Sequence, residues 1–354
     1  MIRTINFLIL MISTGCYAQE YRNYDVQIPP AFELANIMVA LTEFGQLDDN
    51  IVKKNTEYHS AVMSHFSAFT EHPAIEELNR LFSGNKSKDY LSYNYWRTGS
   101  YGATFKENRL LFDRQVSNNL FEKNRKLVED FAKKSDFFSF YTAHEPLYTG
   151  YTKRYIQTVP IGEMWEWIES QFPDRYDGYK IIMSPLISGY HNTFKTYDFV
   201  KETVMVINVP RPIINNTEIS DEDKANMIRT VLTEIDHNYV NPISDDWKRE
   251  IRSALFNLNC WKSGALGYNS PYATFNEYMT WAVFSIYLKE KFDAETFNVV
   301  NKLQADFMAD RRGFIKFREF NNYLLEQYLT KTQNEKIPDL YSDAIQWFEK
   351  QNCN

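Results

Sequence analysis

The sequence predicts an α+β fold that is mostly α-helical. Apolar residues recur at helical spacing through the first third of the chain. Two short segments in the middle, 179–187 and 203–209, are rich in β-branched residues, as strands are. Helical spacing then resumes at Ser220 and continues to the end. Because 44% of the residues are hydrophobic and Gly and Pro number 12 each, the chain has ample material for a packed core.

Residues 19–354 are expected to form one domain, because no linker or repeat divides them. Its N-terminal part, about residues 30–175, is expected to be helical. The part that follows, about residues 176–345, is expected to hold the small sheet and the helix that comes after it.

The first 18 residues have the pattern of a secretory signal peptide. Arg3 supplies a positive charge, residues 5–12 form an apolar run, and small residues precede a mature start at Gln19. An alternative is lipid attachment at the cysteine of residues 13–16, although that stretch lacks the usual preceding leucine. The mature protein is therefore expected to be exported to the periplasm or the extracellular space, or held at the outer membrane by a lipid anchor.

The composition of the chain limits the kinds of partner that it is expected to bind. The net charge of −7 argues against nucleic acid as a partner, and no later apolar stretch is long enough for a transmembrane segment. Cys260 and Cys353 would remain after removal of the signal peptide, and an oxidising compartment permits them to pair. The sequence leaves that pairing open.

The helices before the sheet follow from apolar spacing and from two prolines, Pro73 in a first turn and Pro173 after a last turn. They are expected at residues 31–43, 58–69, 73–82, 120–131 and 161–172.

The two expected strands are separated by a turn region that contains Gly189, which is compatible with a hairpin. The clearest helices of the C-terminal part are expected at residues 276–288, 294–311 and 317–329.

The helix after the sheet has a defined start and a polar face. Ser220 and Asp223 form a capping box, and Pro242 is expected to end the helix near Asn241. Asp236 is expected to point sideways. The apolar face gathers Ile228, Val231, Leu232, Ile235 and Tyr239, and the polar face gathers Thr230, Thr233, Glu234, His237, Asn238 and Asn241. The polar row is long and poor in Lys and Arg, so we expect the region to line a cleft, with Thr233, Asn238, Tyr190 and Tyr239 as lining residues.

Residues 233–237, Thr-Glu-Ile-Asp-His, are a damaged form of the zinc-peptidase motif His-Glu-x-x-His. In the intact motif two histidines bind zinc from one helix face and the glutamate activates a water molecule. Glu234 and His237 occupy the second and fifth positions, while Thr233, a poor zinc ligand, occupies the first. Without the motif, the same two residues could form a surface ion pair or a Glu-x-x-His metal pair.

A second element lies at Asn276-Glu277, within a helical stretch. It resembles the Asn-Glu-x-x-Ser-Asp element of thermolysin-like gluzincins, whose glutamate is the third zinc ligand. Thr280 replaces the serine, and Trp281 replaces the aspartate that would orient the first histidine. A structural alternative is a capping box formed by Thr274 and Glu277.

Taken together, these elements resemble an uncharacterised family of secreted bacterial proteins in the zincin-like, gluzincin-type metallopeptidase superfamily, with a degenerate HExxH motif. The resemblance runs from His65 to Ile315 and is most specific at residues 234–238, 240–242 and 276–277. It implies a zincin-like domain: a small sheet whose edge strand overlies the motif helix, followed by a helix that supplies a glutamate.

The resemblance implies a zinc site with His237 and Glu277 as ligands and Glu234 as the catalytic residue. His191 is a further candidate ligand, and His144 a weaker one. Tyr190, Tyr239 or Tyr268 would stabilise an oxyanion. The expected function is an exported zinc-metallopeptidase-like hydrolase acting on a peptide or protein. The alternative is a catalytically inactive zincin-fold protein that binds peptides or glycans, and a metal-free hydrolase using the two glutamates stays open.

Overall fold

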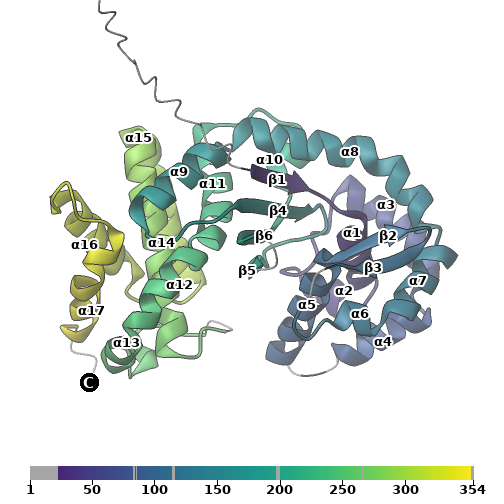
Figure 1. The fold of residues 1–354 in the computed structure, drawn as a ribbon, viewed down its shortest axis with the longest axis horizontal. Coiled ribbons are helices and arrows are strands. Elements are labelled where there is room, and N and C mark those ends of the chain that lie inside the picture. The colour runs from purple at the N-terminus through teal and green to yellow at the C-terminus, as the bar shows by residue number, and fades with distance from the viewer. Residues whose placement is uncertain are drawn as a thin grey trace, which may run out of the picture.

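The computed structural model describes residues 23–351 apart from 83, 85, 114–115, 197–199 and 265–266. The predicted class is confirmed, because the protein is α+β and mostly helical. The expected signal peptide and Cys353 lie outside the described residues. Figure 1 shows a small central sheet between the N-terminal helices and the C-terminal helices.

The five helices predicted before the sheet are confirmed, although two of them are split by short interruptions. Two further helices, α5 and α8, were missed, because aromatic, Ser, Thr and Gly residues obscure their apolar spacing and Pro146 lies inside α8. The N-terminal elements are α1 (Pro30–Ala40), α2 (Glu43–Leu47), α3 (Glu57–Phe66), η1 (Ser67–Phe69), α4 (Pro73–Leu81), α5 (Lys86–Tyr101), β2 (Ala103–Lys106), β3 (Arg109–Phe112), α6 (Leu120–Lys123), α7 (Arg125–Lys134), α8 (Phe137–Thr158) and α9 (Ile161–Gln171).

The central sheet has four strands in the order β1-β4-β6-β5, namely β1 (Asn23–Gln27), β4 (Gly178–Ser184), β6 (Glu202–Asn208) and β5 (Asn192–Thr196). The two predicted strands are β4 and β6, which are neighbours but run parallel, so the hairpin between them is wrong. The short edge strand β5 pairs with β6 in antiparallel orientation instead. Its half-buried residues give no alternating pattern, which explains why the sequence did not reveal it.

Helices form most of the C-terminal part. Helix α14 is buried continuously from Thr274 to Leu288, so it runs through the core rather than along the surface. The C-terminal elements are α10 (Arg211–Ile214), α11 (Asp221–Ile235), α12 (His237–Asp246), α13 (Lys248–Ala254), η2 (Leu258–Cys260), α14 (Pro271–Lys291), α15 (Ala294–Asp306), the π-helical turn η3 (Phe307–Arg311), α16 (Phe317–Thr330), η4 (Ile337–Leu340) and α17 (Tyr341–Glu349).

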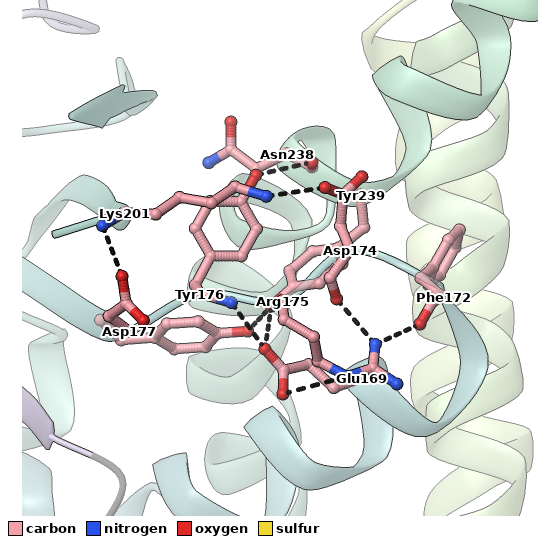
Figure 2. A network of polar contacts seen from close by, with 10 residues as sticks. Glu169, Phe172, Asp174, Arg175, Tyr176, Asp177, Lys201, Asn238 and Tyr239 are labelled. Carbon is pink, nitrogen blue, oxygen red and sulfur yellow. Dashed lines mark hydrogen bonds and ion pairs between the residues drawn. The ribbon is translucent and has the colours of Figure 1, made fainter. Parts of the chain in front are cut away.

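The start of α11 was predicted correctly and its end was not. Ser220 accepts a hydrogen bond from the backbone N–H of Asp223, and the Asp223 carboxylate accepts one from the backbone N–H of Ser220. Helical structure then continues as α12 through Pro242. Proline lacks the N–H that would bond to the Asn238 carbonyl. The Tyr176 hydroxyl donates to that carbonyl at 3.0 Å, as Figure 2 shows, which compensates for the missing bond.

Figure 2 shows a polar network that connects the α9–β4 loop to α12. The Glu169 carboxylate accepts from the Tyr176 backbone N–H at 3.0 Å and from the Tyr239 hydroxyl at 3.2 Å. The backbone N–H of Lys201 donates to Asp177 at 2.7 Å, which ties the start of β6 to the same loop. The network therefore fixes α12 relative to the sheet.

Within the described residues, no helix combines the length and the apolar character needed to cross a bilayer.

Candidate functional site

Six charged or polar side chains from five segments interact where α11, α12 and α14 pack together. We call this group the central cluster. The two elements that the sequence singled out, residues 233–237 and 276–277, meet in it. Its members are Arg229, Glu234, His237, Tyr268, Glu277 and Arg312.

Glu277 is the centre of the cluster and is almost completely buried. One of its carboxylate oxygens, Oε1, accepts hydrogen bonds from the Arg312 guanidinium and, at 2.9 Å, from the Trp281 indole N–H. The other oxygen, Oε2, lies 3.7 Å from His237 Nε2. The expected meeting of His237 and Glu277 therefore occurs, but a guanidinium is bound to the same carboxylate.

The capping role considered for Glu277 is wrong. Helix α14 begins one turn earlier than that role requires, because Ser270 is the N-cap and its hydroxyl accepts from the Ala273 N–H at 3.1 Å. The Thr274 hydroxyl donates to the Tyr268 carbonyl at 2.9 Å instead. Glu277 is thus free to act as a partner for other segments.

Arg312 is placed by an unusual piece of backbone. The chain before it forms the π-helical turn η3, and the Arg312 N–H donates to the Phe307 carbonyl at 3.0 Å. Gly313 follows with φ 75°, and a Cβ atom there would lie 1.9 Å from the Ser263 carbonyl oxygen. Only glycine fits this position. The turn directs the Arg312 side chain to Glu277 and to the Tyr268 hydroxyl, which accepts at 2.9 Å.

A second arginine, Arg229 of α11, lies beside Arg312. The Arg229 Cζ atom lies 4.9 Å from the centre of the Trp281 ring, and the Arg312 Cζ atom lies 5.0 Å from it. Burial, followed by repulsion from Arg312, lowers the pKa of Arg229 to about 10. In the described part of the chain, no hydrogen bond or ion pair reaches the Arg229 guanidinium.

Glu234 is partly exposed, and its carboxyl group makes no hydrogen bond or ion pair with any described residue. Burial, with repulsion from the Glu277 carboxylate as the second cause, raises the pKa of Glu234 to about 8. Glu234 also contributes to raising the pKa of Tyr190, after burial. Glu234 is therefore protonated for the most part at neutral pH.

The pKa values of Glu277 and His237 are shifted downwards, whereas the pKa of Glu234 is shifted upwards. Burial raises the pKa of Glu277, but Arg312 and His237 outweigh it and hold this pKa below its usual value. Burial lowers the pKa of His237, and the Glu277 carboxylate only partly offsets this effect. At neutral pH the cluster therefore contains an ionised glutamate, a neutral histidine and two guanidinium groups.

The described residues do not fit a zinc site. The Thr233 hydroxyl donates to the Arg229 carbonyl at 2.8 Å, so it is committed to the helix backbone. Glu277 is already neutralised by Arg312, and a metal ion beside that guanidinium would be repelled. Among the described residues, no group of three or more His, Cys, Asp or Glu side chains has a metal-binding arrangement.

His191 does not complete such a site either. Burial lowers its pKa to about 3, and the charged groups that act on it are the cations Arg97, Lys53 and Arg229. Its Nε2 atom is buried without a hydrogen-bond partner. His144 lies on α8, where its Nδ1 is bonded to the Phe140 carbonyl at 2.8 Å, apart from the central cluster.

Two residues expected to line a cleft have structural roles instead. Tyr239 is fully buried, and its hydroxyl is bonded to Tyr179 at 2.6 Å and to Glu169, so it does not face a cleft or an oxyanion. The Asn238 side chain donates to Thr193 of β5 at 2.8 Å and to Thr203 of β6. Both residues attach α12 to the rest of the fold.

Two further expectations have mixed outcomes. Tyr190 is partly exposed and packs on the Tyr90 and Tyr93 rings, with its backbone carbonyl held by Arg97 at 2.9 Å. Asp236, which was expected to point sideways, is fully buried. Burial, followed by repulsion from Glu277 and Glu234, raises the pKa of Asp236 well above its usual range.

The two arginines of the central cluster, Arg229 and Arg312, were not predicted from the sequence. Arg229 precedes Thr233 by one helical turn and therefore lies on the same side of α11, so the polar face is not free of cations. Arg312 stands before Gly313 in a segment that the family resemblance includes, but nothing in the sequence connects it with Glu277. The Arg-Gly pair at the end of a helix was the available signal.

Comparisons with protein-family models, with curated proteins and with solved structures gave no match to this chain.

Proposed function

We propose that this chain is a peptide-binding protein on a zincin-like scaffold, in which an ion pair between Arg312 and Glu277 stands where a gluzincin binds its metal. The ion pair is the observation that carries the proposal. It uses the carboxylate that a zinc ion would need, and the Trp281 indole that replaces the orienting aspartate donates to the same oxygen. The Trp281 departure from the motif thus contributes to the same arrangement.

The order and packing of the elements support the scaffold. A small sheet with an antiparallel edge strand, β5, precedes α11, and α14 then supplies a glutamate to residues of α11 and α12. Asn238 of α12 is bonded to Thr193 of β5, so this edge strand lies against the helix pair. The resemblance to zincins implies the same arrangement.

The edge strand also supports a peptide as the ligand. β5 pairs with β6 on one side, and no described strand pairs with its other side. An extended peptide can add to such an edge through main-chain hydrogen bonds. All five residues of β5 are partly exposed, which leaves side-chain contacts available beside those bonds.

A metallopeptidase needs three protein ligands and a water molecule on its zinc. Here one candidate ligand, Thr233, is bonded to the helix backbone and another, Glu277, is bonded to a guanidinium. Binding without metal is therefore the function that the geometry supports best.

The test is retention of peptides from a tryptic digest of casein, read by mass spectrometry with and without a chelator. We expect a subset of peptides to be retained intact in both conditions. Cleavage that the chelator abolishes would make the protein a metallopeptidase, and cleavage that it does not affect would make it a metal-free hydrolase. Retention of no peptide would overturn the proposal, and a parallel oligosaccharide mixture would then test the glycan alternative.

A further inference from the structure

The central cluster contains a guanidinium that has no counterion among the described residues. Arg312 is neutralised by Glu277, whereas no carboxylate pairs with Arg229 in the described part of the chain. Its Nε atom is buried without a hydrogen-bond partner, although the residue as a whole is partly exposed. A desolvated guanidinium left unpaired is costly, so such an arginine is typical of a site that receives an anion.

The Arg229 side chain is held in place by aromatic rings rather than by hydrogen bonds. Its Cζ atom lies 4.9 Å from the centre of the Trp281 ring and 5.9 Å from that of Phe307. These two rings are stacked on each other with centres 5.8 Å apart. Contact with ring faces uses none of the guanidinium N–H groups, so its terminal N–H groups can donate to a planar, two-oxygen acceptor.

The surroundings of Arg229 are positive, in contrast to the net charge of −7 of the whole chain. Arg229, Arg97 and Lys53 all act on His191, whose pKa burial already lowers. The Arg97 guanidinium donates to the Tyr190 carbonyl and, at 2.7 Å, to the Asn192 amide oxygen, so no carboxylate neutralises it there. Because Glu277 is already paired with Arg312, the guanidinium groups of Arg229 and Arg97, unpaired among the described residues, favour an anionic group at the same place.

We infer that Arg229 binds a carboxylate of the ligand through a bidentate pair, and that a peptide supplies this carboxylate from its C-terminus or from an acidic side chain. The inference rests on the proposed peptide binding, because it names the group by which that site recognises its ligand. A carboxylate matches the fork of one guanidinium. A phosphate dianion would call for further free cationic groups, whereas both terminal guanidinium nitrogens of Arg97 and of Arg312 already donate to protein oxygens.

The test compares acetyl-tetra-alanine as the free acid with the same peptide as its amide. Acetyl-Ala-Ala-Glu-Ala amide separates a side-chain carboxylate from a C-terminal one. Affinities are measured by calorimetry at low ionic strength. We expect one of the two carboxylate peptides to bind about tenfold or more tightly than the plain amide. In Arg229→Met this preference should vanish, while the affinity for the amide stays the same.

Arg249→Met is the matched control, because this arginine is exposed on α13 and its loss changes the net charge equally. It should leave the preference intact. Arg229→Met is expected to fold, since the substitution removes an unpaired charge and leaves no new one. As a measurement that needs no peptide, acetate should raise the melting temperature of the wild type and of Arg249→Met but not that of Arg229→Met.

The outcomes separate the two proposals. Equal binding of acid and amide peptides would overturn the carboxylate inference and leave peptide binding standing. Binding of neither would overturn peptide binding. If galacturonate then bound in an Arg229-dependent manner, the carboxylate would belong to a glycan, which contradicts the inference as stated. If acetate failed to stabilise the wild type and no preference existed, Arg229 would not be an anion site.

Discussion

The guanidinium of Arg312 donates a hydrogen bond to the buried carboxylate of Glu277, at the end of the chain's only described π-helical turn. The carboxylate oxygen that accepts this bond also accepts one from Trp281, and the other oxygen lies 3.7 Å from His237 Nε2. A cation supplied by the protein thus stands beside the two side chains that the sequence suggested as metal ligands.

Removing Arg312 should destabilise the protein strongly. Arg312→Met would leave the Glu277 carboxylate buried without its counterion, and breaking a buried ion pair in this way costs roughly 3 kcal/mol or more. Urea unfolding at neutral pH measures the loss. The double variant Arg312→Met with Glu277→Gln should recover part of the stability. An unchanged midpoint in the single variant would show that the ion pair contributes nothing.

Restoring the first motif residue alone should not restore a metal site. In Thr233→His a second histidine lies one turn from His237, but Arg312 still neutralises Glu277. We expect the double variant Thr233→His with Arg312→Met to bind zinc about tenfold or more tightly than Thr233→His, measured by competition with a chromogenic chelator. Zinc should also raise the melting temperature of the double variant. Equal affinities would contradict the role assigned to Arg312.

The Tyr176 hydroxyl should stabilise the protein, because Pro242 lacks the N–H that the helix would otherwise use. Tyr176→Phe removes the donor to the Asn238 carbonyl, which proline leaves without its helical partner, and an unsatisfied buried acceptor costs roughly 1–3 kcal/mol. Thermal unfolding measures the loss. Pro242→Ala in the Tyr176→Phe background supplies an N–H and should recover stability. If the loss of stability in the double variant equalled the sum of the losses in the two single variants, the Tyr176 hydroxyl would not be compensating for the N–H that Pro242 lacks.

Stability should fall with rising pH because of Glu33 on α1. This residue is completely buried, and its carboxyl group accepts from the Tyr58 hydroxyl at 2.7 Å. Burial, the largest effect, raises the pKa of Glu33 from 4.5 to about 7, although hydrogen bonds from Tyr58 and Ser184 oppose the change. Between these two pH values the folded state holds a proton that the unfolded state has released. The contribution of Glu33 is therefore complete below pH 4.5 and is lost as the pH rises through 7.

The measurement is urea unfolding of the wild type and of Glu33→Gln from pH 4.5 to pH 8, a range that spans the Glu33 titration. The difference between them should fall by up to about 1.4 kcal/mol for every pH unit in which only the folded state holds the proton. Glu33→Gln keeps an acceptor for Tyr58 and so serves as the neutral control. A difference that does not change with pH would contradict the raised pKa.

Local patterns in the sequence were sufficient to predict part of the fold and part of the candidate site. The capping box at Ser220 and the spacing of Glu234 and His237 depend on neighbouring residues, and the sequence predicted the start of α11 and the meeting of His237 with Glu277. The end of the helix was missed because the donor that replaces the proline N–H, the Tyr176 hydroxyl, comes from a distant loop.

The features that the sequence did not predict depend on tertiary contacts. Tyr239 lies on the apolar face of its helix, as its spacing indicates, and the hydroxyl that suggested a cleft is satisfied inside the core by Tyr179 and Glu169. Arg312 reaches Glu277 only because a π-helical turn and Gly313 direct it there, and no helix or strand periodicity encodes that direction.

The metal content of residues 19–354 shows whether Glu277 is held by Arg312 or by a metal ion. Residues 19–354 would be purified without chelators or a histidine tag, beside a His237→Ala variant, and both analysed by inductively coupled plasma mass spectrometry. We expect no stoichiometric metal in either protein, because Arg312 neutralises Glu277 and Thr233 is bonded to the helix backbone. One zinc ion for each wild-type chain, lost in the variant, would contradict metal-free binding and favour the metallopeptidase alternative.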